Sequence, residues 1–142
     1  MNRLLSLALV STLATVAGCS NMPAMQAAPV APAQSVAFVA PADGATVTSP
    51  FLVKFAVTGM QVAPAATFVP DTGHHHLLIN AAEIPAMGAI PADAQHLHFG
   101  KAQTETTLTL PPGTYKLTMQ FGNGYHQAYG PAMSKTITVK VL

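Results

Sequence analysis

Two stretches in which every second residue is large and apolar constrain the fold of this chain most. They are residues 51–58 and 114–121, and prolines and glycines that favour turns lie on both sides of each stretch. A period of two is typical of a half-buried strand. In the second stretch, this period predicts that Met119 points into a core while Thr118 and Gln120 point outward.

Strands are predicted throughout residues 35–142. Short apolar runs alternate there with turn-forming residues, and no segment has the period of an amphipathic helix. We therefore expect an all-β domain, an antiparallel immunoglobulin-like β-sandwich of about seven strands. A small β-barrel is the alternative. Residues 81–95 contain two prolines and a glycine, so we expect a long irregular connection there.

The N-terminal 18 residues have the features of a lipoprotein signal peptide. A cationic start precedes an apolar run that is too short to span a bilayer. The segment Val16-Ala17-Gly18-Cys19 resembles a bacterial lipobox, which implies that Cys19 is lipid-modified and begins the mature chain. Cys19 is the single cysteine, so no internal disulfide can form. An ordinary signal peptide with an incidental cysteine is the alternative.

Residues 19–34 are rich in alanine and proline, and we expect them to form a tether between the lipidated cysteine and the β-domain. Ser20 follows Cys19 where lipoproteins retained in the inner membrane typically have aspartate. The expected location is therefore the bacterial cell envelope, as an exported outer-membrane lipoprotein that faces the periplasm. The membrane is the expected partner at this end of the chain.

Charge and motif content exclude several classes of function. The chain has six Lys and Arg residues, five Asp and Glu residues and a formal net charge of +1, with no basic block. This balance excludes nucleic acid as a partner. The sequence has no nucleophile elbow, phosphate loop or paired-carboxylate arrangement, so we do not expect an enzyme. No protein partner is indicated.

Six histidines are the most unusual chemical feature of the chain, and five of them fall in two short segments. Because alternate residues of a strand share a face, His74 and His76 are expected to point one way and His75 the other. The same rule places His96 and His98 on one face of a second segment. If the two segments pair as neighbours, their imidazoles meet, and His126 can join them from a later loop.

Several imidazoles in one place suit zinc or copper, so the expected cofactor is one of these two ions, bound by His74, His76, His96, His98 and His126. Met87 and Met133 lie in loops and could add thioether ligands, which together with the lack of a thiol favours copper over structural zinc. Asp71 and Asp93 flank the histidine segments as possible ligands or as partners that orient an imidazole.

The alternative function is a non-catalytic structural or interaction module of the cell envelope. In that case the histidines would be hydrogen-bonded to neighbouring groups or would sense pH between about 5 and 8. The two functions differ in what they require of the fold. A metal site needs imidazole nitrogens that converge on a point, whereas dispersed or carbonyl-capped rings favour the module.

Five segments together carry a resemblance to bacterial domain-of-unknown-function family 4399. Three of them are Gly73-His74-His75-His76-Leu77-Leu78-Ile79-Asn80, His96-Leu97-His98-Phe99-Gly100-Lys101-Ala102-Gln103-Thr104-Glu105 and Leu110-Pro111-Pro112-Gly113-Thr114-Tyr115-Lys116-Leu117. The other two are Ile84-Pro85 and His126 followed by Pro131 and Ser134, and the resemblance runs from about residue 36 to the C-terminus. It implies a small exported β-domain and supports the importance of the histidine segments, without implying an activity.

Overall fold

Strand β8 (Gly113–Gly122) is the middle strand of the larger of two sheets, and it contains the more regular of the two alternating stretches. The structure, a computed structural model, describes residues 33–142. The expected signal peptide, Cys19 and most of the expected tether therefore lie outside the described residues. Within the described part, no helix has the length and apolar character needed to cross a bilayer.

The larger sheet has six strands in the order β2-β9-β8-β5-β4, and β6 also pairs with β5. The smaller sheet has the order β1-β3-β7. All pairings are antiparallel except the two-residue pairings β2–β9 and β4–β5. The remaining strands are β1 (Ser35–Ala40), β2 (Thr46–Val47), β3 (Phe51–Thr58), β4 (Gln61–Val62), β5 (Thr72–Ile79), β6 (His96–His98), β7 (Glu105–Leu108) and β9 (Ser134–Val141).

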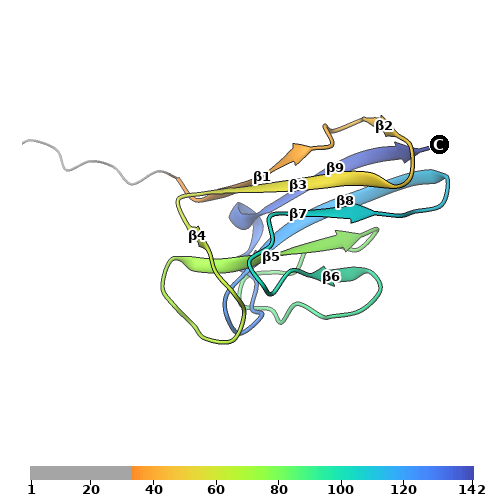
Figure 1. Cartoon of the computed structure of the whole chain (residues 1–142). Helices are drawn as coiled ribbons and strands as arrows, with labels where there is room; N and C mark the ends of the chain where they lie inside the picture. Colours follow the sequence, from red (N-terminus) through yellow and green to blue (C-terminus); the bar gives the residue numbers. More distant parts are fainter. Residues whose placement is uncertain (1–32) are drawn as a thin grey trace, which may run out of the picture.

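The two sheets pack face to face, as Figure 1 shows for β1, β3 and β7 lying over β9, β8 and β5. The predicted all-β, antiparallel sandwich is confirmed. Two of its strands have only two residues each, and alternation cannot distinguish pairs of that length from turns. A single 3-10 turn, η1 (Pro131–Met133), leads into β9.

The core between the sheets is built from the predicted alternation. Leu117, Met119 and Phe121 of β8 are fully buried, and they share a hydrophobic cluster with Val53 and Phe55 of β3. Burial of an apolar side chain of this size contributes about 1.5–3 kcal/mol to folding. The inward face of the larger sheet is therefore the one that the sequence predicts.

Part of the opposite face of the larger sheet, toward the end of β8, is also buried, which corrects the expectation that Thr118 and Gln120 point to solvent. Their exposed fractions are only 2% and 0%. The connection over residues 81–95, called the covering loop below, contacts Gln120. Gln120 anchors it, because its side-chain oxygen accepts the backbone N–H of Ile84 at 2.8 Å and its amide nitrogen donates to the Ile84 carbonyl. The fold thus has a second, smaller interior, outside the sandwich core.

Candidate metal centre

The register of β5 decides which histidines enter this second interior. His76 pairs with Gln120 of β8 on one side and with His98 of β6 on the other. His74 lies two residues earlier, opposite Gly122. Because side chains alternate along a strand, His74 and His76 share the face of Gln120, and His98 comes up beside them from β6.

Four imidazoles meet at this place. Nε2 of His76 lies 2.9 Å from Nε2 of His74, and Nε2 of His126 lies 3.0 Å from Nε2 of His98. One ring nitrogen from each of His74, His76 and His98 lies within 4.8 Å of the other two. The six ring-centre distances in this group, called the histidine quartet below, range from 4.6 to 5.9 Å.

His126 reaches the quartet from a turn over residues 123–127 that Asn123 organises. The side-chain oxygen of Asn123 accepts the backbone N–H groups of Tyr125 and Gln127, at 2.9 and 3.0 Å. His126 has a positive φ of 62°, a backbone conformation that residues other than glycine seldom adopt. The hydrogen bonds of Asn123 therefore hold a strained turn that aims the His126 ring at the sheet.

The covering loop fixes the other side of this turn. The carbonyl of His126 accepts the backbone N–H of Ile90 at 2.8 Å, and two further backbone bonds join Met87 and Gly88 to Ala128. Ile90 is itself buried, with 5% of its surface exposed. The backbone of the fourth histidine is thus held by the covering loop, which Gln120 anchors to the sheet.

Two glycines make room for the rings. A Cβ atom on Gly122 would lie 2.9 Å from the Ile90 side chain and 3.3 Å from Nε2 of His76. A Cβ atom on Gly100 would overlap the His98 ring, with a separation from its Nε2 of only 2.4 Å. A larger residue at Gly100 would displace the His98 ring, and one at Gly122 would displace Ile90 and press on the His76 ring, because these separations are shorter than ordinary van der Waals contact.

Burial keeps the imidazoles of His74 and His76 uncharged at neutral pH. It lowers the pKa of His74 from 6.5 to about 4, with smaller contributions from the imidazoles of His98, His126 and His75. The pKa of His76 is lower still, again mainly because the ring is buried. Burial and the neighbouring His126 also lower the pKa of His98. Neutral imidazole is the form that binds a metal ion, so protons compete weakly with an ion for His74 and His76.

The hydrogen bonds inside the quartet leave polar atoms unpaired. A contact between two Nε2 atoms needs one protonated and one bare nitrogen, so the two rings of a pair must be opposite tautomers. The Nδ1 atoms of His74 and His76 are buried and have no hydrogen-bond partner among the described residues. A buried donor without a partner costs about 1–3 kcal/mol. These two unpaired nitrogens therefore oppose the stability of the fold.

His96, a predicted ligand, lies outside the quartet. It pairs with Leu78, two residues beyond the position where His98 faces His76. Its Nδ1 lies 2.8 Å from Oδ1 of Asp93, which also accepts the backbone N–H groups of Gln95 and His96. These bonds lower the pKa of the Asp93 carboxyl, and the bond with the His96 side chain has the largest effect. Asp93 thus orients the His96 imidazole, which the structure does not bring to the quartet.

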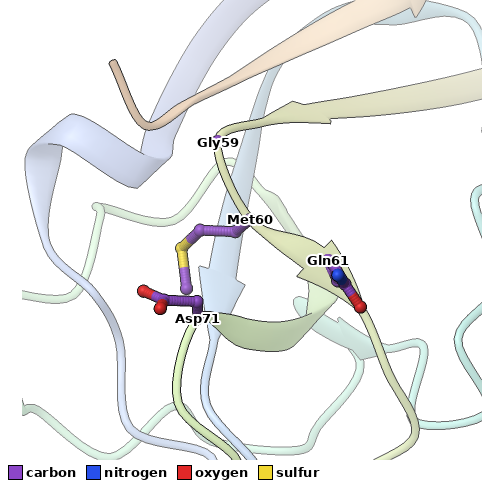
Figure 2. Close-up of a pocket in the computed structure, with 4 residues that line it drawn as sticks. All are labelled: Gly59, Met60, Gln61 and Asp71. Carbon is purple, nitrogen blue, oxygen red and sulfur yellow. The ribbon is translucent and has the colours of Figure 1, made fainter. Parts of the chain in front are cut away.

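The other predicted additional ligands are also placed elsewhere. Met133 is 1% exposed and belongs to the sandwich core, whereas Met87 is 67% exposed on the covering loop. Asp71 lines an open depression of about 320 Å³ together with Gly59, Met60 and Gln61. Figure 2 shows the Met60 side chain reaching toward Asp71 in this depression. No histidine lines it, so it is separate from the quartet.

His75 points into the sandwich core, as the period of two predicts. Its ring lies between Phe55 and Phe121, with ring centres 5.0 Å from each. Neither ring nitrogen has a hydrogen-bond partner among the described residues, and burial lowers the pKa of His75 to about 4. This histidine packs as an apolar ring would, at the cost of two unpaired polar atoms.

Sequence reasoning did not identify the residues that position the quartet: Gly100, Gly122, Asn123 and Gln120. The Gly122-Asn123-Gly124 segment was visible only as a break after a strand. Asparagine between glycines is typical of a turn, but nothing in that pattern indicates which side chain the turn will present. The structure identifies these residues because it shows what each of them touches.

Comparison with known proteins identifies the family of this domain. The model of a family described as Domain of unknown function (DUF4399) matches residues 53–142, which include all four members of the quartet. The resemblance seen in the sequence is confirmed over that range, which begins later than the expected residue 36. No curated protein and no solved structure matches the chain. Since the match covers more than half of the 142 residues, the chain belongs to the DUF4399 family.

Proposed function

We propose that this protein is a binding protein for one transition-metal ion, copper or zinc, held by His74, His76, His98 and His126. The observation that carries the proposal is the convergence of ring nitrogens, three of which lie within 4.8 Å of one another. His126 extends the set, with its Nε2 3.0 Å from that of His98. Imidazole nitrogen is a common ligand for both ions.

The cost of the quartet supports a functional role over a purely structural one. Hydrophobic side chains would fill the same space without leaving buried nitrogens unpaired. Local choices that oppose stability are expected at functional sites. A single ion would bind the Nε2 lone pairs of all four rings. The two imidazole–imidazole hydrogen bonds, in contrast, each use the lone pair of only one of their two rings.

Exposure in the quartet is graded in a way that suits ion entry. His74 and His76 are fully buried, whereas His98 is exposed and His126 is partly exposed. An ion could therefore reach the exposed pair from solvent and complete its coordination on the buried pair. The positions of Met87 and Met133 offer no support for thioether ligation, so copper and zinc enter the test on equal terms.

Titration of the purified protein with Cu⁺, Cu²⁺ and Zn²⁺ tests the proposal. We expect one ion per chain with a Kd below about 1 µM for at least one of them. His98→Ala should weaken that binding at least about tenfold, and since His98 is exposed the variant should still fold. His96→Ala is the matched control, because it removes a histidine of the same strand that lies outside the quartet, and its affinity should equal that of the wild type.

Absence of stoichiometric binding by all three ions would sink the metal proposal. The alternative would then stand, a non-catalytic structural or interaction module whose imidazoles are hydrogen-bonded or pH-sensing. Equal losses in His96→Ala and His98→Ala would also contradict the proposal, because they would show that the affinity does not depend on the quartet.

We also propose, from the sequence, that the protein is exported and anchored at the bacterial cell envelope by a lipid on Cys19. The support is the lipobox-like segment at residues 16–19 and the single cysteine. In the producing bacterium, the wild type should sediment with the membranes and carry the mass of an acylated N-terminal cysteine. Cys19→Ser should lose both properties. An unmodified Cys19 in the wild type would exclude the anchor.

A further inference from the structure

We propose that the quartet is a tetrahedral site that selects d¹⁰ ions, Zn²⁺ or Cu⁺, over ions that prefer a square-planar arrangement. This inference rests on the proposed function and specifies which ions the site prefers. It follows from the arrangement of the four rings, because ring centres around an ion repeat the coordination geometry on a larger scale.

The ring centres are nearly equidistant. With metal–nitrogen bonds of about 2.0–2.1 Å, each imidazole centre lies about 3.2 Å from the ion, so a regular tetrahedron has six separations of about 5.2 Å. Five of the six observed separations lie between 4.6 and 5.1 Å, and the sixth, between His76 and His126, is 5.9 Å. No pair departs from the tetrahedral value by more than about 0.7 Å.

A square arrangement fits much less well. It requires four separations of about 4.5 Å and two diagonals of about 6.4 Å, and each ring belongs to only one diagonal. If His76 and His126 form one diagonal, at 5.9 Å, the other must join His74 and His98, which are 4.9 Å apart. That diagonal is too short by about 1.5 Å, and any other choice leaves both diagonals short.

The strands that carry the histidines limit how far the four rings can move toward a square-planar arrangement. His74 and His76 lie on one strand between paired neighbours, and Gly122 leaves no space beside the His76 ring. His98 is fixed opposite His76 by the β5–β6 pairing. Because packed interiors resist deformation, moving one diagonal by more than an ångström would require a shift of the backbone.

Charge in the quartet agrees with this choice. Imidazole is a neutral ligand, and the group of possible ligand atoms around His74, His76 and His98 contains no carboxylate and no thiol. A monovalent ion is less costly than a divalent one in such surroundings, since the desolvation cost grows with the square of the charge.

Cobalt and nickel provide the test, because Co²⁺ reports geometry by its spectrum and Ni²⁺ prefers square or octahedral sites. The purified protein is titrated with Co²⁺, and Zn²⁺ or Ni²⁺ is then added in separate experiments to displace Co²⁺ from the quartet. We expect the intense visible absorption of tetrahedral Co²⁺ and at least a tenfold preference for Zn²⁺ over Ni²⁺. A competition between Zn²⁺ and Cu⁺ under anaerobic conditions identifies which d¹⁰ ion the site favours.

Two variants relate the result to the quartet. His126→Ala should lower the Co²⁺ affinity at least tenfold, and His96→Ala should leave both spectrum and affinity unchanged. A weak octahedral Co²⁺ spectrum, or equal or tighter binding of Ni²⁺ than of Zn²⁺, would overturn the tetrahedral assignment while leaving metal binding intact. Failure of every ion to bind would overturn the proposed function itself.

Discussion

The backbone N–H of His126 donates to the backbone carbonyl of Asn123 at 2.9 Å, and the amide oxygen of the same asparagine accepts the N–H groups on either side of His126. Asn123 is only 4% exposed. One buried residue thus sets the direction of a histidine that is otherwise carried by a loop. Of the four quartet members, His126 depends most on such local hydrogen bonds, since the other three lie on paired strands.

Asn123→Ala is therefore expected to weaken metal binding about as much as His126→Ala, by roughly 10–100-fold, a range typical of the loss of a group that orients a ligand. The reason is that the turn would no longer hold His126 at its strained φ. Competition with a chromophoric chelator measures both affinities. The double variant should be no weaker than His126→Ala alone, because the two changes remove the same interaction.

Asn80→Ala is the matched control for that experiment. Asn80 also has a positive φ, and its side chain also accepts a backbone N–H, that of Lys116. It lies at the end of β5, outside the quartet, so its loss should lower stability without changing the metal affinity. Additive effects of Asn123→Ala and His126→Ala would contradict the positioning role.

Gly122→Ala should weaken metal binding at least about tenfold and lower the free energy of unfolding by about 1–3 kcal/mol, the usual cost of overpacking. Its Cβ would lie 2.9 Å from Ile90 and 3.3 Å from the His76 ring. Gly113→Ala is a matched control on the same strand, because its Cβ would meet only Tyr115, at 3.4 Å or more. Urea denaturation and metal competition measure both effects, and equal losses in the two variants would refute the steric argument.

His75→Leu is expected to raise the free energy of unfolding at pH 7 by about 1–2 kcal/mol. The change replaces a buried ring with two unpaired nitrogens by an apolar side chain of similar volume. Metal affinity should not change, since His75 points to the other side of the sheet. Urea denaturation is the measurement. A clear loss of stability would mean that the His75 nitrogens make interactions that the packing between Phe55 and Phe121 does not reveal.

Stability should fall steeply on acidification. Burial lowers the pKa values of His74 and His75 from 6.5 to about 4, and that of His76 further. Between these values and 6.5, the unfolded chain binds protons that the folded chain does not, so stability is complete above pH 6.5 and decreases as the pH falls toward 4. Each such group contributes about 1.4 kcal/mol per pH unit in this window.

Three such groups would remove several kcal/mol by pH 5, a large part of the roughly 5–15 kcal/mol that stabilises a typical domain. We therefore expect the protein, treated with a chelator, to unfold on acidification above pH 4. His75→Leu should reduce the slope of stability against pH, because it removes one of the groups whose pKa is lowered in the folded state. A flat profile between pH 6.5 and 5 would show that these imidazoles accept protons in the folded state.

The sequence was sufficient for the parts of the site that depend on strand period alone. Alternation placed His74 and His76 on one face and His75 in the core, and the pairing of the two histidine segments brought in His98. It also predicted the sandwich and the buried face of β8. Each of these depends on a local rule that holds wherever a strand is half-buried.

The sequence was not sufficient to predict the features that depend on contacts between residues far apart in the chain. His96 and His98 look equivalent, but Asp93 lies close enough along the chain to bind one of them, and only His98 faces His76 across the sheet. Thr118 and Gln120 were expected outside because alternation does not show what covers a sheet. Gln120 is buried because it binds Ile84, 36 residues away in the chain.

The quartet is also a contact of high sequence separation, since His98 and His126 are 28 residues apart and reach the buried pair through separate elements. An unfolded chain would offer the same four imidazoles, but too far apart to chelate one ion together. Bound metal would therefore stabilise the native state by mass action and should act mainly by slowing unfolding, because the turn at Asn123 and the β6 pairing must both be complete before four nitrogens meet. Metal retention would then be a measure of whether the turn at Asn123 and the β5–β6 pairing are both formed.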